Sequence, residues 1–410
     1  MTMTLREEAL KMHLENNGKI SVVSKVPIAN RHDLSVAYTP GVAEPCKDIK
    51  ENKDLSFEYT CRGNMVAVIS DGTRVLGLGD IGPEAAIPVM EGKAALFKTF
   101  SDVDAVPICL GTKDPEEFIR TVKLLEPNYA GINLEDISSP KCYDIECRLK
   151  EICDIPVFHD DQHGTAIACL SAVIGALRYV KKDFRTARFV VNGCGAAGSA
   201  IGRLLVSMGA QNVIMVDRFG ALYEGIDAKL DRIQSYLASV TNKEHRQGTL
   251  ADVAKGADVL IGVSAPNVFT KEIMQSMAKD SVVFALANPV PETSYDEAKA
   301  AGVAVAGTGR SDRPNQVNNV TVFPGVFRGA IDVRARAITE EMKVAAVFAI
   351  SELIDEKDLR EDYVVPDAFD PRVAPAVAAA VAKTAIELGL ARKIVDPEVV
   401  RANTMKRVGR

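Results

Sequence analysis

The sequence predicts an α/β protein of two domains, each containing a parallel sheet with helices packed against it. The chain has 410 residues, which is more than one ordinary domain contains. Short apolar strand-like runs alternate with helical stretches along most of the chain, and this alternation is typical of parallel sheets. A charged stretch at 181–183 separates two such alternating blocks. We therefore expect a domain boundary at that point.

The first block of elements begins with a polar helical arm at 1–20 that ends near Gly18. An apolar run, a turn at Asp71 and Gly72 and a second short run predict a hairpin over 65–78. Asp114, followed by a proline and two acidic residues, predicts the start of a helix. The other elements expected here are helices at 83–100, 140–152 and 165–180 and strands at 103–110, 129–134 and 155–159.

The second block of elements repeats this alternation. We expect strands at 187–192, 212–217, 258–263, 281–286 and 303–306, with a helix at 196–208. The chain is expected to be helical from Thr339 onward, with an Ala- and Val-rich run at 374–386, and its basic end at 406–410 is expected to fray. The predicted divisions are an arm at 1–20, an N-terminal domain at 21–181, a second domain at 182–392 and a C-terminal tail at 393–410.

Composition and charge exclude several classes of protein. Hydrophobic residues make up 47% of the chain and charged residues 25%, which is typical of a folded globular protein rather than a disordered one. A net charge of −6 disfavours general binding to nucleic acid or to an anionic membrane. No apolar run approaches the ~20 residues of a membrane span, and the charged start lacks a secretory signal, so we expect a cytoplasmic protein.

The pattern G-x-G-x-x-G occurs twice, with Gly77, Gly79 and Gly82 in the first match and Gly193, Gly195 and Gly198 in the second. Only the second match directly follows a predicted strand and opens a helix, which begins at Ala196 and Ala197. Such a loop lets the backbone approach the pyrophosphate of a dinucleotide at a helix N-terminus. In the first match Asp80 and Glu84 would repel a phosphate, so we expect that loop to lie near the substrate instead.

The acidic residue that ends the next strand indicates which dinucleotide binds. Asp217 lies 19 residues after Gly198, the distance expected for an acid that hydrogen-bonds the ribose 2′-hydroxyl of NAD. Arg218 follows it and could instead accept the 2′-phosphate of NADP, or could be a solvated surface charge. The sequence therefore predicts a Rossmann-type doubly wound sheet that binds NAD, and it leaves NADP open.

Acidic side chains follow two other predicted strands at the point where each strand ends. Glu135 and Asp136 come after the strand at 129–134, and Asp160 and Asp161 come after the strand at 155–159. Because ligands gather at the carboxyl ends of parallel strands, these acids are expected to form one site. Carboxylate oxygens favour Mg²⁺ or Mn²⁺, although some of these acids could instead cap helices. Zinc is disfavoured, since His159 and His163 do not lie on one helical face.

Four other polar residues are candidates for the same chemistry. Lys93 lies in an otherwise apolar helix, where burial would lower its pKa and suit it as a general base, unless it extends to the helix surface. Tyr38 precedes a turn that could present its phenol to a cleft, or it could be a packed core tyrosine. Asn288 and Asn319, each beside a predicted strand, are ligand donors or turn residues, and the sequence does not distinguish these roles.

Taken together, these segments resemble the malic enzymes, specifically their short bacterial form. The resemblance is carried by motifs in order along most of the chain, at 38–46 (YTPGVAEPC), 70–82 (SDGTRVLGLGDIG), 89–97 (VMEGKAALF), 133–136 (NLED), 158–166 (FHDDQHGTA), 193–198, 288–289 and 307–325. The family implies oxidative decarboxylation of L-malate to pyruvate and CO₂, with NAD(P)⁺ reduced and Mn²⁺ or Mg²⁺ required.

The resemblance also assigns roles to individual residues. It implies that Glu135, Asp136 and Asp161 are the metal ligands, with Asp160 beside them. It implies that Lys93 takes the C2-hydroxyl proton and that Tyr38 later protonates C3 of the enolate. It further implies that Arg74 binds a malate carboxylate and that Asn288 and Asn319 contact substrate or nicotinamide. The short form implies a homodimer, with the N-terminal arm as a candidate interface element.

Two other functions compete with this one. A malolactic enzyme, a close relative that keeps NAD bound and releases lactate, shares the same motifs. A catalytically inactive dinucleotide-binding protein would bind NAD without turnover, and the presence of Lys93, Tyr38 and the acidic residues argues against it.

Overall fold

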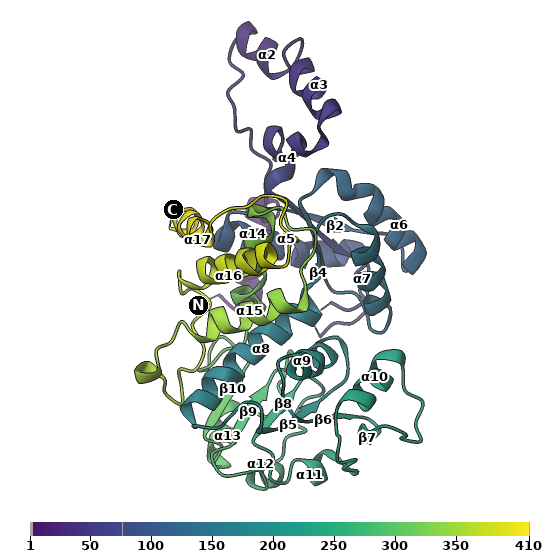
Figure 1. Ribbon diagram of the computed structural model, residues 1–410, viewed down its shortest axis with the longest axis vertical. Helices are drawn as coiled ribbons and strands as arrows, with labels where there is room; N and C mark the ends of the chain where they lie inside the picture. Colours follow the sequence, from purple (N-terminus) through teal and green to yellow (C-terminus); the bar gives the residue numbers. More distant parts are fainter. Residues whose placement is uncertain (1–2, 76, 410) are drawn as a thin grey trace.

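The computed structural model describes residues 3–75 and 77–409 (Figure 1). It contains two sheets, one of four strands and one of six, with helices packed on both. This confirms the predicted fold class. A segment that carries the helices α2 and α3 stands out from the rest of the molecule along its longest axis (Figure 1).

The first sheet has the strand order β2-β1-β3-β4, and all its strands are parallel. The strands are β1 (Met65–Ser70), β2 (Asp104–Cys109), β3 (Gly131–Leu134) and β4 (Val157–His159). Helix α5 (Pro83–Ser101) joins β1 to β2, α6 (Pro115–Leu125) joins β2 to β3, and α7 (Lys141–Ile152) joins β3 to β4. The carboxyl ends of β3 and β4 are therefore neighbours, as the acidic pairs predicted.

The hairpin predicted over 65–78 is wrong. Strand β1 pairs in parallel with β2 on one edge and with β3 on the other, and the segment after it is a loop with one isolated bridge, between Val75 and Gly79. Leu76 lies outside the described residues. The continuous apolar run of β1 is that of a central strand buried on both faces, which needs a neighbour on each edge.

The second sheet has the order β10-β9-β8-β5-β6-β7. Its strands are β5 (Arg188–Asn192), β6 (Asn212–Asp217), β7 (Gly220–Ala221), β8 (Val259–Gly262), β9 (Val282–Ala285) and β10 (Val305–Thr308). All pairs are parallel except β6 with β7. The order reverses between β5 and β8, which is the switch point of a doubly wound sheet, where ligands bind. The helices among these strands are α9 (Ala196–Ser207), α10 (Arg232–Val240), α11 (Leu250–Val253), α12 (Lys271–Gln275) and α13 (Tyr295–Ala300).

The remaining helices join the two sheets. Helix α8 (Asp160–Tyr179) begins at the acidic pair itself, five residues before the predicted start, and lies between the two sheets (Figure 1). Of the C-terminal helices α14 (Phe323–Asp332), α15 (Glu340–Ser351) and α16 (Val373–Glu387), α14 packs on α5 through Phe323 and Phe97, whose ring centroids are 4.6 Å apart. Core residues from both sheets thus belong to one apolar cluster.

The frayed end predicted at 406–410 is wrong for residues 406–408, and Arg410 lies outside the described residues. Residues 397–408 form helix α17 (Pro397–Val408), capped by Asp396 and anchored by the buried side chains of Val400 and Thr404. Its basic last turn is therefore a helix end, where positive charge is favourable, rather than a loose terminus.

The N-terminal helices contrast with the rest of the chain. They are α1 (Leu5–Asn16), α2 (Arg31–Ala37), α3 (Ala43–Glu51) and α4 (Ser56–Tyr59), and none of them contains a buried residue. The expected arm is present as α1, and Lys19 just after it bonds to Glu91 and Pro88 of α5. None of the described helices is both long enough and apolar enough to cross a membrane.

Candidate active site

Three carboxylates meet at the carboxyl ends of β3 and β4. Glu135 and Asp136 follow β3, and Asp161 lies in the first turn of α8 directly after β4. One oxygen from each lies within 4.8 Å of the others. The backbone fixes this arrangement, since the Glu135 amide donates to the carbonyl of Ile69 on β1 (2.9 Å) and the Asp136 amide donates to Asp161 Oδ2 (2.8 Å).

Lys93 of α5 points into this carboxylate cluster. Its Nζ lies 2.6 Å from Asp160 Oδ2, 3.2 Å from Glu135 Oε1 and 4.2 Å from the ring centroid of Phe323. Only 11% of its side chain is exposed, so Lys93 does not extend to the helix surface.

The pKa predicted for Lys93 has the wrong direction. Burial opposes the ammonium form, but the carboxylates of Asp160 and Glu135 outweigh it, and the pKa of Lys93 is raised above its ordinary value. The sequence showed the apolar helix around Lys93, whereas the two carboxylates come from elements that are distant along the chain.

The donor set of the cluster fits a hard divalent cation. Burial raises the pKa of Glu135 well above its ordinary value, and the neighbouring charges of Asp161, Asp160 and Asp136 add to this, while Lys93 opposes it. A cluster of oxygen ligands that repel one another in a buried place favours binding of Mg²⁺ or Mn²⁺. Among the described residues, the group with metal-ligand spacing contains neither histidine nor cysteine, which disfavours zinc.

Asp160 fixes the position of the Lys93 side chain. It is fully buried, and its Oδ2 accepts both from Lys93 and from Asn319 Nδ2 (2.9 Å), while its Oδ1 has no hydrogen-bond partner. A Cβ at Gly164 would lie 1.8 Å from that Oδ1, so only glycine fits one turn along α8. The Asp160 carboxylate is thereby held with one face toward Lys93.

The predicted substrate-binding residues lie around this centre in different ways. The backbone amide of Arg74 donates to the carbonyl oxygen of Asp136 (3.0 Å), and this bond places the exposed Arg74 next to the carboxylate cluster. Asn319 starts the short helix η4 (Asn319–Thr321) and bonds to Asp160 and Thr165, so its amide orients protein side chains. Asn288 is exposed in the loop after β9.

The three glycines of the loop after β5 have the environments expected of a dinucleotide site. Gly193 has φ = +114°, a conformation that other residues rarely adopt. A Cβ at Gly195 would meet nothing within 4 Å, whereas a Cβ at Gly198 would lie 1.8 Å from the Gly193 carbonyl oxygen. The loop therefore turns at the first glycine, is open at the second and packs tightly at the third, with Ala196 and Ala197 beginning α9.

Asp217 ends β6, as predicted, next to this loop. Its Oδ1 accepts from the Arg218 amide (2.8 Å) and its Oδ2 accepts from the side chain of Gln234 on α10. The Arg218 guanidinium stacks 4.8 Å from the ring centroid of Phe219. Both candidates for the ribose end of a dinucleotide are thus side by side at the strand end.

The other glycine loop links the two sheets. A Cβ at Gly77 would lie 2.6 Å from Pro289 Cδ, so the loop after β1 meets the loop after β9. This loop also follows a strand and precedes a helix, but it begins seven residues beyond the end of β1, whereas Gly193 follows β5 directly. The contact places Asn288 beside the loop that carries Arg74.

Tyr38 does not join the other candidates. It follows α2 directly, its exposed fraction is 66%, and α2 stands away from α5, β4 and α8 (Figure 1). It is neither a packed core tyrosine nor a residue of this chain's own carboxylate cluster.

A buried polar network lies beside the site, and no sequence motif pointed to it. His163 Nε2 pairs with Glu146 (2.6 Å) and His163 Nδ1 with Lys343 Nζ (3.0 Å), which link α7, α8 and α15. His163 is thus a hydrogen-bonded structural histidine, whereas the ring nitrogens of the buried His159 have no hydrogen-bond partner. The only signal in the sequence for this network is the presence of ionisable residues in the helices α7, α8 and α15.

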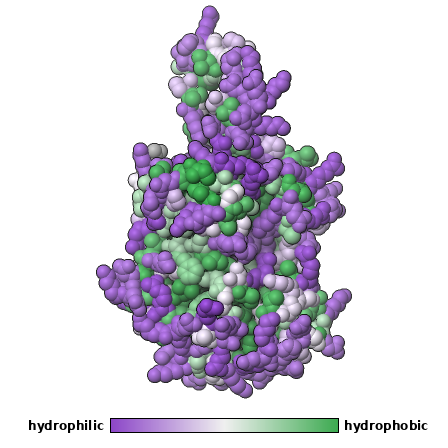
Figure 2. Space-filling model, viewed as in Figure 1, coloured by the Kyte–Doolittle hydropathy of each residue, from purple (hydrophilic) through white to green (hydrophobic). Residues whose placement is uncertain are grey.

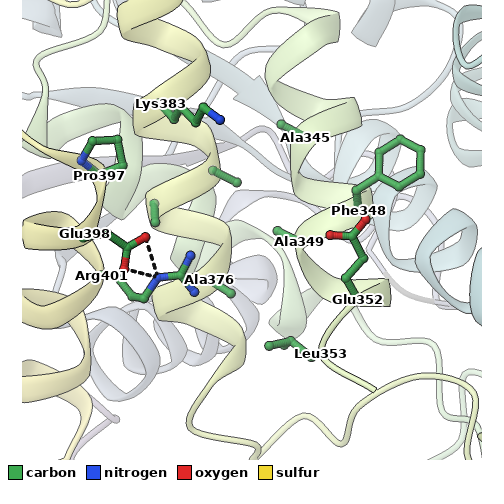
Figure 3. A pocket seen from close by; sticks show the side chains of 12 residues that line it. Ala345, Phe348, Ala349, Glu352, Leu353, Ala376, Lys383, Pro397, Glu398 and Arg401 are labelled. Atoms are coloured by element: carbon green, nitrogen blue, oxygen red, sulfur yellow. Dashed lines mark hydrogen bonds and ion pairs between the residues drawn. The ribbon is translucent and has the colours of Figure 1, made fainter. Parts of the chain in front are cut away.

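A surface groove lies elsewhere, between α15, α16 and α17 (Figure 3). It encloses about 390 Å³, is lined largely by alanines together with Phe348 and Leu353, and has the Glu398–Arg401 pair on one wall. It contains none of the predicted site residues.

Comparison with known proteins identifies the family. The malic enzyme N-terminal domain matches residues 17–150, and the malic enzyme NAD binding domain matches residues 162–386. The chain belongs to the malic enzyme family. It is 56% identical over 98% of both chains to the bifunctional malic/malolactic enzyme of Bacillus subtilis, and 51% identical to the NAD-dependent malic enzyme of Geobacillus stearothermophilus, over 95% of this chain and 81% of that one.

Solved malic enzyme structures share the fold. The malic enzyme of Pyrococcus horikoshii superposes with a TM-score of 0.96 at 46% identity, covering 99% of this chain and 96% of that one. The malic enzyme of Entamoeba histolytica gives 0.94 at 40% identity, covering 98% and 86%. The second sheet described above is thus the NAD binding domain of a malic enzyme, and the chain is an oxidoreductase of this family.

Proposed function

We propose that this chain catalyses the oxidative decarboxylation of L-malate to pyruvate and CO₂, with reduction of NAD⁺ or NADP⁺ and with Mn²⁺ or Mg²⁺ required. The observation that carries the proposal is the position of Lys93. Its amine lies inside a cluster of buried carboxylates in a malic enzyme domain, and the loop after β1 of that domain meets the loop after β9 of the NAD binding domain.

The residues can divide the reaction among them. Lys93 accepts the C2-hydroxyl proton while the hydride leaves C2 for the nicotinamide, and Arg74 binds a carboxylate of malate through its guanidinium. Tyr38 gives a proton to C3 after CO₂ has left. To act as the base, Lys93 has to be neutral. Because the carboxylates of Glu135 and Asp160 stabilise its ammonium form, their interaction with Lys93 must weaken before Lys93 can accept a proton.

Glu135, Asp136 and Asp161 would hold the divalent cation. When bound, it would supply positive charge beside the C2 oxygen, where negative charge develops. Asp160 and Asn319 position Lys93 rather than touch the substrate. Gly193, Gly195 and Gly198 would admit the pyrophosphate, and Asp217 or Arg218 would contact the ribose.

Conversion of L-malate to lactate and CO₂ with bound NAD is the second candidate. It is favoured by the 56% identity to a relative that is named for both malic and malolactic activity. We further propose that the domains divide near residue 181 and that the enzyme acts as a homodimer in the cytoplasm.

The first experiment is to follow the absorbance of reduced nicotinamide. Purified protein is given L-malate and Mn²⁺ with NAD⁺ or NADP⁺, with and without a chelator, and pyruvate and lactate are quantified. We expect chelator-sensitive reduction with an equal amount of pyruvate. Lactate without net reduction would make the second candidate correct, and the absence of both products would refute both.

Replacement of Lys93 tests the observation on which the proposal rests. Lys93→Ala should lower kcat by roughly two to four orders of magnitude, as expected for a missing general base. Lys98→Ala is the matched control, because Lys98 lies on the same helix with 56% of its side chain exposed. Near-normal turnover of Lys93→Ala would remove Lys93 from the mechanism.

A further inference from the structure

Glu292 joins the ends of two neighbouring strands in the second sheet. It lies in the segment after β9 and is fully buried. Its Oε1 accepts from the backbone amide of Ser264 (2.7 Å), in the loop after β8, and its Oε2 accepts from the backbone amide of Ala287 (3.0 Å), in the loop after β9. One carboxylate therefore holds two loops that follow paired parallel strands.

The backbone around Glu292 is arranged to accommodate its side chain. The carbonyl oxygen of Glu292 accepts from the Phe269 amide (3.0 Å), which fixes the backbone at this position. A Cβ at Gly262, the last residue of β8, would lie 2.4 Å from Glu292 Cδ. Strand β8 thus ends in the one residue that leaves room for the carboxylate.

The loop after β8 also contacts the glycine loop after β5. Asn192, the last residue of β5, donates from its Nδ2 to Ser264 Oγ (2.7 Å). A Cβ at Gly193 would lie 2.7 Å from the carbonyl oxygen of Val263. Because these contacts are continuous with the hydrogen bonds of Glu292, the positions of the three loops depend on one another.

The order of the strands indicates which part of the dinucleotide these loops meet. In the second sheet β6 lies on one side of β5, and β8 and β9 lie on the other. Asp217 and Arg218, the candidates for the ribose end, follow β6, and the glycine loop after β5 is the place for the pyrophosphate. The nicotinamide half then lies over the ends of β8 and β9, where Ser264 and Asn288 are exposed.

From this geometry we infer that Glu292 is a positioning residue for the nicotinamide half of the dinucleotide. It lies beneath the exposed loops and acts through them rather than by touching the cofactor. Both of its oxygens are needed, because a carboxylate accepts at each oxygen whereas a glutamine side chain accepts at one end and donates at the other. The inference goes beyond the proposed function, since it concerns dinucleotide binding by the NAD binding domain and holds for either product.

Glu292→Gln tests the inference because it keeps the size of the side chain and removes one acceptor. The wild type and the variant are titrated calorimetrically with NADH and with ADP-ribose, which lacks only the nicotinamide. We expect the Kd for NADH to rise roughly tenfold, because one loop amide is left without its acceptor, and the Kd for ADP-ribose to stay unchanged.

Glu297→Gln is the matched control. Glu297 also accepts from a backbone amide, that of Ser294 (3.0 Å), but it is exposed on α13. This variant should bind both ligands as the wild type does. Equal weakening of NADH and ADP-ribose by Glu292→Gln would show a general structural role, and an unchanged Kd for NADH would show no role in positioning. Either result would overturn the inference.

A second measurement uses the wild type alone, so it does not depend on how well the variant folds. Hydrogen exchange is resolved to single amides by mass spectrometry with electron-transfer fragmentation. After correction for intrinsic rates, we expect the amides of Ser264 and Ala287 to exchange roughly tenfold more slowly than those of their neighbours Ala265 and Asn288. Equal exchange would overturn the inference. An enzyme inactive on malate that shows the expected binding and exchange would overturn only the proposed function.

Discussion

At the scale of single residues, the glycines of the loop after β5 illustrate how one motif contains different constraints. Gly195 faces open space, while Gly198 has no room for a Cβ because the Gly193 carbonyl oxygen would be 1.8 Å away. The first is required by a ligand that approaches the backbone, and the second by the packing of α9 on β5. Substitutions at Gly195 and Gly198 should therefore impair different properties, dinucleotide binding at the first and stability at the second.

We expect Gly195→Ala to fold normally and to bind NAD⁺ more weakly by roughly tenfold, because a methyl group would occupy the approach of the pyrophosphate. Gly198→Ala should instead lower the free energy of unfolding by about 1–3 kcal/mol or more through overpacking. Urea unfolding and NAD⁺ titration of both variants measure the two effects. Equal destabilisation of both variants would contradict these separate roles.

Asp217 tests the choice of dinucleotide. Its carboxylate is held by Gln234 and the Arg218 amide at the end of β6. We expect Asp217→Ala to weaken NAD⁺ by about tenfold, the cost of a lost hydrogen bond to a charged group, and to affect NADP⁺ less. Kd values of both dinucleotides measured by fluorescence give the answer. Equal effects on both would mean that Asp217 does not contact the ribose.

At the scale of elements, helix α8 and its neighbours bring together the acids and a buried charge network. Its first turn supplies Asp160 and Asp161, and its next residues supply His163, which bonds to Glu146 of α7 and Lys343 of α15. Lys343 is 1% exposed and also pairs with Glu340 (2.6 Å). Helix α8, which carries two acids of the site, is thus joined to α7 and α15 by ionisable side chains as well as by apolar packing.

Lys343 should make stability depend on pH in the alkaline range. Burial, together with the charge of Lys150, lowers its pKa from 10.5 to about 8, although Glu340 and Glu146 oppose this. Between these two pKa values the unfolded chain binds more protons than the folded one, so the free energy of unfolding rises with pH.

The contribution of Lys343 between pH 7 and pH 9.5 is about 2 kcal/mol. We expect the wild type to gain that much relative to Lys343→Met over this range, as measured by urea unfolding at both pH values. Lys383→Met is the control, because Lys383 lies on the C-terminal helix α16 with 64% of its side chain exposed. A pH-independent difference between the wild type and Lys343→Met would contradict the lowered pKa.

At the scale of the whole molecule, the segment at 20–55 that carries α2 and α3, here called the protrusion, separates the acid and base candidates. Its α2 stands clear of the body, with Tyr38 exposed at its end, while Lys93 is buried among carboxylates in the body (Figure 1). The apolar residues of the protrusion, visible among polar ones in Figure 2, have no packing partner within the described part of the same chain that would bury them. Activity should therefore depend on association.

A charge on the protrusion should produce a monomer. Val36, exposed by 62% on α2, can be replaced by aspartate without disturbing any core. We expect Val36→Asp to weaken association by about a hundredfold, because an unpaired carboxylate would be buried in the interface, and to lose malate turnover with it. Light scattering with size exclusion measures the mass. Leu124→Asp on α6, exposed by 70%, is the matched control, and an intact Val36→Asp dimer would contradict the role of the protrusion.

The sequence by itself determined most strands and helices, the glycine loop with Asp217, and the acidic pairs after β3 and β4. These features are local, because periodicity, capping residues and residues at strand ends act over a few positions. It also determined the family resemblance, which depends on residue order alone. It did not determine that the basic residues 406–408 continue helix α17, which is held by packing against other helices.

Only the tertiary structure decided which strands are neighbours, how Lys93 is charged and where Tyr38 lies. Strand β1 takes partners from two distant segments, so the apolar run and the turn that suggested a hairpin could not show its true pairing. The pKa of Lys93 depends on Glu135 and Asp160, which folding brings to it from far along the chain. Tyr38 has a candidate role from the sequence, but its separation from Lys93 follows from the path of the protrusion. These properties depend on contacts between remote residues, which no local pattern encodes.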